Sequence, residues 1–90
     1  MNSVTHDDPA TAPLLCLRLS TDGDPGALTR VLGCFQNLNI TPRRVLAELA
    51  SDARLHVQIE VCGLSEQRLG QIAARAGKVP SVLNVYWHRR

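Results

Sequence analysis

The chain has 90 residues, enough for one small domain, and 44% of them are apolar, which is typical of a folded globular protein. Ten basic and eight acidic side chains give a net charge of +2, too balanced to indicate a partner such as nucleic acid or a membrane surface. No apolar run approaches the roughly 20 residues of a membrane span. The N-terminal residues have neither the basic start nor the apolar core of a secretory signal, so we expect a cytoplasmic protein.

The three cysteines, Cys16, Cys34 and Cys62, are an odd number and lie far apart in the sequence. No CxxC pair exists, so the sequence offers neither a zinc ribbon nor a thioredoxin-type redox motif. Each cysteine lies in or beside an apolar segment, where a reduced thiol behaves as a small hydrophobic group. We therefore expect reduced cysteines and no metal or other cofactor.

In chain order, residues 1–13 lack periodicity and predict a flexible leader, followed by one domain over residues 14–90. The leader contains His6, Asp7 and Asp8, which we interpret as a solvated tail rather than a metal site. Residues 14–20 (LLCLRLS) alternate as in a strand.

A helix is predicted next, with Asp24 as its N-cap, Pro25 as its first helical residue and Gly26 allowing a tight entry. Its end is predicted near Asn37, which tolerates a left-handed backbone. The apolar stripe of this helix consists of Leu28, Val31, Leu32 and Phe35.

Two strands are predicted after this helix, over residues 40–50 and, after a turn at 51–53, over residues 55–61. Ser65 is predicted to cap a second helix that ends at Gly77. The last strand is predicted over residues 83–88. The inward-facing residues that these patterns predict are Val45, Ala47, Leu49, Leu55, Val57, Ile59, Val61, Leu69, Ile72, Ala73, Ala76, Leu83, Val85 and Trp87.

The predicted fold class is α+β, because the element order β-α-β-β-α-β produces a ferredoxin-like βαββαβ sandwich. Right-handed crossovers give a four-stranded antiparallel sheet with two helices on one face. The other face is predicted to be a mixture of polar and apolar side chains, which favours a covering partner. Its members are Cys16, Arg18, Arg44, Leu46, Glu48, His56, Gln58, Glu60, Asn84, Tyr86 and His88.

Several functions of this fold are disfavoured by the residues. An RNA-recognition surface needs aromatic residues on the central strands, and the chain has one Phe, one Tyr and one Trp. The loop DGDPGA matches neither phosphate-binding glycine motif and carries two carboxylates that repel phosphate. It also lacks the arginine of acylphosphatase-like enzymes. His56 opposite Glu48 is interpreted as a surface contact rather than an acid–base pair, so we expect no enzyme.

Four segments in order, DPGALTRVL, NLNI, LHVQIEV and VPSVLNVYW, resemble an ACT domain, a small regulatory module that typically binds amino acids and pairs with a second copy. The resemblance covers residues 14–88. Within that family, a free-standing chain of this length looks most like the short regulatory subunit of acetohydroxyacid (acetolactate) synthase. That resemblance implies allosteric regulation of branched-chain amino acid biosynthesis through a homodimer and a catalytic partner.

The resemblance also implies a site for an amino-acid effector. In ligand-binding members the first loop reads Asn or Asp, any residue, Pro, Gly; here Pro25 and Gly26 match, while Gly23 occupies the polar position. The family pattern Gly-x-Asn-Ile after the helix matches Asn39 and Ile40, with Asn37 in place of glycine. We expect the two loops to meet at one end of the sheet, closed by a dimer partner. The implied ligand-binding residues are Asp24, Gly26, Ala27, Asn37, Asn39 and Ile40.

The leading hypothesis is a non-catalytic regulatory subunit that dimerises and modulates an amino-acid biosynthetic enzyme. Its candidate partner surface includes Arg44, Leu46, Tyr86 and the basic C-terminal residues. The alternative is a free-standing amino-acid sensor without a fixed enzyme partner, which would bind its ligand in isolation.

Overall fold

The computed structural model describes residues 13–90, so the predicted leader lies outside the described residues apart from Pro13. The predicted order of two helices and four strands is confirmed. The elements are β1 (Leu14–Thr21), α1 (Ala27–Asn37), β2 (Arg44–Leu49), β3 (Leu55–Cys62), α2 (Glu66–Ala76) and β4 (Val82–Arg89).

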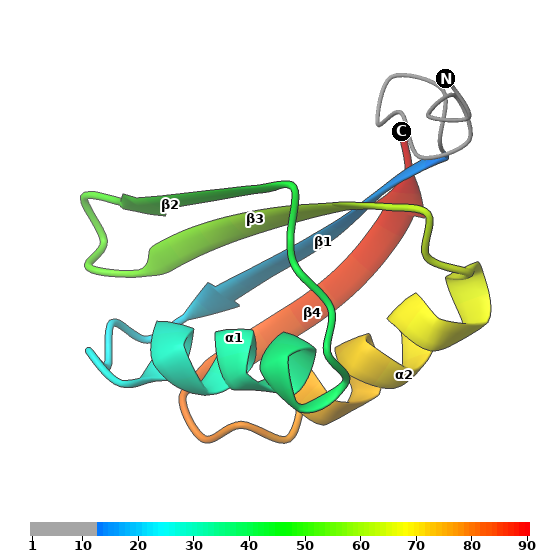
Figure 1. Cartoon of the computed structure of the whole chain (residues 1–90). Helices are drawn as coiled ribbons and strands as arrows, with labels where there is room; N and C mark the ends of the chain where they lie inside the picture. The colour runs from blue at the N-terminus through cyan, green and yellow to red at the C-terminus, as the bar shows by residue number, and fades with distance from the viewer. Residues whose placement is uncertain (1–12) are drawn as a thin grey trace.

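The four strands form one sheet in the order β2-β3-β1-β4, and every neighbouring pair is antiparallel. Both helices lie on the same side of this sheet and leave its other face open (Figure 1). The predicted ferredoxin-like α+β sandwich is therefore confirmed. Each helix connects two strands that have one other strand between them in the sheet, which is the split βαβ arrangement.

The core lies between the sheet and the two helices. It consists of the alternate side chains of β1 and β3 together with the inward stripes of both helices, as the periodicities predict. Its buried members are Leu15, Leu17, Leu19, Val31, Cys34, Phe35, Val57, Ile59, Val61, Leu69, Ile72 and Ala76.

The start of α1 differs from the prediction. The helix begins at Ala27 with Gly26 as its N-cap, so Asp24 is not the N-cap and Pro25 is not helical. The Asp24 carboxylate accepts the Gly26 N–H at 3.0 Å, and the Ala27 N–H donates to the Asp24 carbonyl at 3.0 Å. Asp24 therefore closes a turn that precedes the helix, because its side chain bonds the N–H two residues further on.

The ends of the helices follow the prediction more closely. α1 ends at Asn37, but the left-handed residue is Asn39, with φ of 59°, because a further turn after the helix delays the reversal. Ser65 caps α2 as predicted, since its hydroxyl accepts the Arg68 N–H at 3.1 Å. Gly77 is the C-cap of α2 and keeps a right-handed backbone, with φ of −65°.

β2 is shorter than predicted and its inward side is not buried. Residues 40–43 cross from the helix layer to the sheet, and the strand begins at Arg44. Val45 pairs with the buried Ile59 and so faces the helix side, yet Val45 is 41% exposed and Leu49 is 70% exposed. The alternation correctly indicated a strand, but β2 lies at the edge of the sheet, where the helices do not cover it.

The register of β4 shifts at its first residues. Asn84 pairs with Ser20 while Val82 pairs with Thr21, so Leu83 is an extra residue in the ladder. Val82, Val85 and Trp87 pack against the core, whereas Leu83 is 47% exposed. The prediction of Leu83 as a buried residue is wrong because alternation alone does not reveal a bulge.

Candidate functional site

A groove of about 570 Å³ lies between α1, the loop that connects α1 to β2, and the start of β2. Its volume is in the range of small-molecule sites. Most of its surface is apolar and comes from α1, the loop that follows α1 and the start of β2. The lining residues are Thr29, Leu32, Gly33, Phe35, Gln36, Asn39, Ile40, Thr41, Pro42 and Val45.

Two of the predicted ligand residues, Asn39 and Ile40, lie in this groove. The Ile40 N–H donates to the Phe35 carbonyl at 2.9 Å, which folds the loop back against the helix end. Asn39 is exposed and has a carboxamide that both donates and accepts hydrogen bonds. The groove thus combines an apolar wall with a polar group at one end.

The other predicted residues lie elsewhere. Gly26 and Ala27 are at the start of α1, and Asn37 is at its end, so ten helical steps of about 1.5 Å separate Ala27 from Asn37 by roughly 15 Å. The expectation that both loops meet within one chain is therefore wrong. Ala27 is fully buried, and Asn37 is exposed beside the groove without lining it.

The first loop is held by its own side chains. Asp24 accepts from the Gly26 N–H, pairs with Arg30 and accepts from the Ser81 hydroxyl at 3.2 Å. The Gly26 N–H, and next the Arg30 guanidinium, hold the pKa of the Asp24 carboxyl below its usual range. Asp24 is therefore engaged by the chain itself rather than presented to a ligand.

Backbone donors of this loop are also occupied. The Gly23 N–H donates to the Thr21 hydroxyl and the Asp24 N–H to the Asp22 carboxylate, both at 3.1 Å. Gly23 has φ of 93°, and a Cβ there would lie 2.6 Å from the Ala53 carbonyl oxygen. No side chain fits at the position where ligand-binding relatives of the ACT domain have Asn or Asp, because the β2–β3 turn packs against it.

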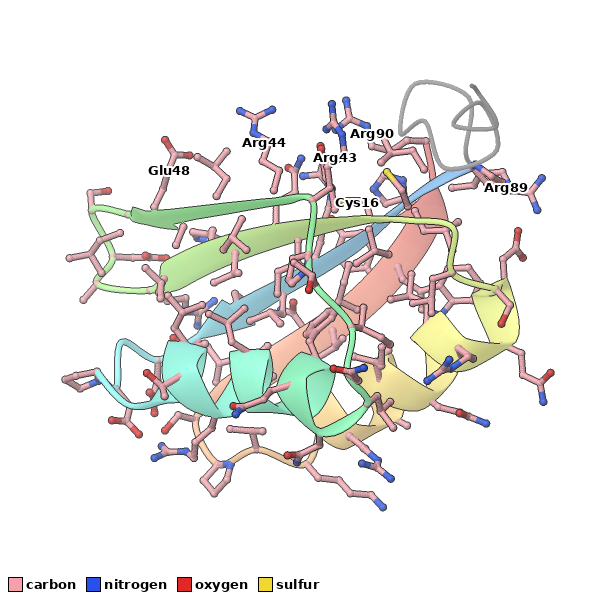
Figure 2. All side chains as sticks on the ribbon, viewed as in Figure 1. Cys16, Arg43, Arg44, Glu48, Arg89 and Arg90 are labelled. Atoms are coloured by element: carbon pink, nitrogen blue, oxygen red, sulfur yellow. The ribbon has the colours of Figure 1, made fainter. Side chains whose placement is uncertain are left out.

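The basic residues at the C-terminus are largely paired. The carboxylate of Glu60, 1% exposed, binds Arg43 at 2.9 Å and also Arg90, and Arg89 pairs with Glu66. The Arg43 N–H donates to the Glu60 carbonyl at 2.7 Å. Figure 2 shows Arg43, Arg44 and Arg90 on the sheet side opposite the helices. One buried carboxylate therefore holds two arginines at this corner, an arrangement that we call the Glu60 clamp.

Cys16 lies beside this clamp, opposite Glu60 in the sheet, and is fully buried. Burial raises the pKa of the Cys16 thiol. All three cysteines are free thiols. A buried thiol with a raised pKa is a poor nucleophile, so Cys16 is a packing residue.

The family model of the ACT-like domain matches residues 10–90. The chain belongs to the ACT-like domain family. ACT domains are regulatory modules that bind amino acids, and they occur in regulators of diverse enzymes. No curated protein matches the sequence significantly. No helix in residues 13–90 is long and apolar enough to cross a membrane.

Solved structures with the same fold as this ACT-like domain come from several bacteria. The ACT domain of GTP pyrophosphokinase from Chlorobium tepidum has a TM-score of 0.72 at 17% identity, covering 87% of this chain and 100% of that one. The C-terminal domain of the MgtC protein from Mycobacterium tuberculosis has a TM-score of 0.72 at 19% identity, covering 92% and 93%. An ACT domain protein from Streptococcus pneumoniae has a TM-score of 0.67 at 12% identity, covering 88% and 91%. At these identities the likeness concerns the fold.

Proposed function

We propose that this ACT-like domain is a non-catalytic regulator that pairs with a second copy through β2 and binds an amino acid in the groove beside α1. The observation that carries the proposal is the position of the groove. It lies directly beside an exposed apolar edge strand and contains Asn39 and Ile40, the two residues that match the family pattern after the helix.

The β2 edge is suited to pairing. The Ala50 N–H donates to the Arg54 carbonyl at 2.8 Å, and these residues are in register across the hairpin. Because backbone groups alternate along an antiparallel strand, those of Val45, Ala47 and Leu49 point away from β3. An edge with free backbone groups and exposed apolar side chains is a template for another strand.

Antiparallel pairing of two β2 strands would also reunite the two halves of the predicted site. A two-fold axis at the β2 edge places the α1 helices of the two copies side by side in opposite directions. The first loop of one copy, with Gly26, then lies near Asn39 of the other. This arrangement supports a site at the dimer interface, to which each copy contributes one of the two loops.

The groove favours an amino acid with an aliphatic side chain. Leu32, Phe35, Ile40 and Val45 line it, and such a wall binds an apolar side chain better than a charged one. This lining supports a branched-chain effector. Together with the sequence resemblance, we propose a cytoplasmic role as regulatory subunit of an enzyme of the acetohydroxyacid synthase type.

Thermal unfolding against each of the twenty amino acids tests the ligand. A ligand at 100 times its dissociation constant stabilises by about 2.7 kcal/mol, which is expected to raise the midpoint by roughly 10 °C. We expect the shift for valine, leucine or isoleucine. Asn39→Gly, which suits the φ of 59°, should abolish it, whereas the control Asn37→Ala should retain it. No shift with any amino acid, or an equal loss in both variants, would contradict the groove as the site.

Ala47→Pro tests the dimer. Proline removes an N–H that points away from β3, so the substitution should leave the sheet of one copy intact while it blocks pairing. Sedimentation is expected to show a dimer for the parent chain and for the control Ala47→Ser, and a monomer for Ala47→Pro. A dimer that persists in Ala47→Pro would assign the interface to another surface.

Activity measurements on an acetohydroxyacid synthase catalytic chain separate the two roles. Activation by the added ACT-like domain, reversed by valine, supports the regulatory subunit. Ligand binding without any effect on the enzyme supports the free-standing sensor.

A further inference from the structure

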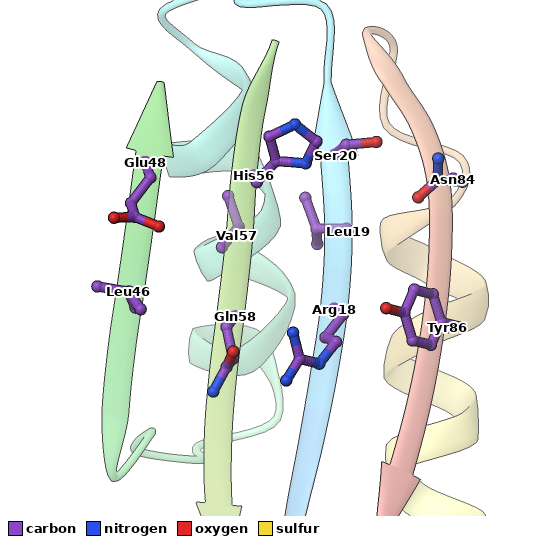
Figure 3. A pocket seen from close by; sticks show the side chains of 10 residues that line it. All are labelled: Arg18, Leu19, Ser20, Leu46, Glu48, His56, Val57, Gln58, Asn84 and Tyr86. Carbon is purple, nitrogen blue, oxygen red and sulfur yellow. The ribbon is translucent and has the colours of Figure 1, made fainter. Parts of the chain in front are cut away.

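A second cavity, of about 300 Å³, lies on the open face of the sheet, on the opposite side from the α1 groove. Residues of all four strands line it (Figure 3). The lining residues are Arg18, Leu19, Ser20, Leu46, Glu48, His56, Val57, Gln58, Asn84 and Tyr86. Arg18, Gln58, Leu46 and Tyr86 share one row across the sheet, and Ser20, His56, Glu48 and Asn84 share the next.

Arg18 lies on β1 between Gln58 and Tyr86, in the lower row of Figure 3, and is half-buried. Its Nε donates to Nε2 of His88 at 3.0 Å, while Nδ1 of His88 is 3.2 Å from the Arg89 carbonyl oxygen. This pattern fits a neutral imidazole with its proton on Nδ1. The His88 contact holds the guanidinium in place but supplies no negative charge.

Within residues 13–90, no carboxylate lies within ion-pair distance of Arg18, whereas Arg30, Arg43 and Arg90 each have such a partner. Other arginines without a partner in this part of the chain, such as Arg44, are exposed to water. A partly desolvated guanidinium favours an anion, and a carboxylate can accept two parallel hydrogen bonds from it.

The rest of the cavity restricts the kind of anion. Glu48 on β2 carries a negative charge at the opposite wall, which disfavours a doubly charged anion such as phosphate and attracts an amino group. From strand spacing and rise, the Cα atoms of Arg18 and Glu48 are roughly 12 Å apart, so their long side chains approach a small molecule from two sides. The Gln58 and Asn84 amides add donors and acceptors between them.

We propose that the open-face cavity binds a small molecule whose carboxylate and amino group are at opposite ends of a short chain, unlike an α-amino acid, with the carboxylate on Arg18 and the amino group toward Glu48. This site is separate from the α1 groove and does not depend on Asn39. The two sites therefore give a regulator two inputs, one on each side of the sheet.

The experiment is an NMR titration of the ¹⁵N-labelled full chain with 4-aminobutanoate, butanoate and inorganic phosphate. We expect saturable shifts of the amide signals of Arg18, Gln58 and Asn84 with 4-aminobutanoate, weaker binding of butanoate and the weakest binding of phosphate. Absence of saturable shifts at these residues with either carboxylate overturns the proposal. Binding of phosphate as tightly as 4-aminobutanoate overturns the assigned role of Glu48.

Three substitutions at Arg18 and Glu48, with two controls elsewhere, locate the site. Arg18→Gln should weaken 4-aminobutanoate at least about tenfold, because charged hydrogen bonds contribute more than one decade of affinity. Arg18→Lys should keep part of the affinity, and the control Arg44→Gln, with the same charge change on the same face, should keep all of it. Glu48→Gln should reduce the affinity for 4-aminobutanoate to that for butanoate. Equal losses of affinity in Arg18→Gln and Arg44→Gln would show a general charge effect and reject the site. Asn39→Gly should leave the amide shifts unchanged, whether or not the α1 groove binds its ligand.

Discussion

Phe35→Ala is expected to destabilise the domain by about 3–5 kcal/mol, the usual cost of removing a buried aromatic ring. Phe35 is 1% exposed and belongs to the core between α1 and the sheet. Its carbonyl also accepts the Leu38 and Ile40 N–H groups, so the loop that lines the groove is anchored at this residue. Since small domains are stable by about 5–15 kcal/mol, this loss removes a large share of the total.

Urea and thermal unfolding followed by circular dichroism measure this effect. The midpoint should fall by more than about 10 °C. Phe35→Leu, which keeps most of the volume, should be much milder, and Gln36→Ala on the exposed neighbour should change stability by less than about 0.5 kcal/mol. If Phe35→Ala unfolds at nearly the same temperature as the parent chain, the core is not packed around this ring.

Gly23→Asn is expected to destabilise the domain by about 2 kcal/mol or more, although it restores the residue that ligand-binding ACT domains have at this position. The backbone at Gly23 has φ of 93°, and any Cβ would meet the Ala53 carbonyl oxygen at 2.6 Å. The position of a Cβ is fixed by the backbone and the Ala53 carbonyl is itself backbone, so a change of rotamer cannot relieve the contact. The β2–β3 turn would have to move away from the first loop.

Gly63→Asn is the matched control for Gly23→Asn. Gly63 has φ of 71°, but a Cβ there meets nothing within 4 Å. Its substitution therefore tests the cost of a positive φ without a clash, which asparagine tolerates better than most residues. Denaturant midpoints of the two variants give the difference, and equal losses would mean that the contact with Ala53 is unimportant.

The elements were predictable because each has a clear hydrophobic period, and both helix stripes and the β3 alternation are found in the core. The exposure of β2 was not predictable, because Val45 and Leu49 alternate as in a covered strand. Whether a helix lies over a strand depends on the tertiary arrangement. The same reason applies to Leu83, whose bulge is a property of its pairing with β1.

The candidate site was predictable in part. Asn39 and Ile40 were indicated by the family resemblance, and the groove contains both. The resemblance did not indicate that α1 separates Asp24 and Gly26 from them, whereas the predicted cap already indicated that the Asp24 carboxylate bonds its own chain. The cavity around Arg18 was missed, although the alternation correctly placed Arg18 and Gln58 on one face. Its walls come from four strands, so only the register brings them together.

Glu60 hydrogen-bonds both to the loop beside the α1 groove and to a residue that lines the open-face cavity. Arg43 directly follows Pro42 of the groove, and Glu60 holds both its backbone N–H and its guanidinium. The second oxygen of the same carboxylate accepts the Gln58 amide at 3.3 Å, at the border of the open-face cavity. The loop that lines the groove and the border of the open-face cavity therefore share one buried hydrogen-bonding group, the carboxylate of Glu60.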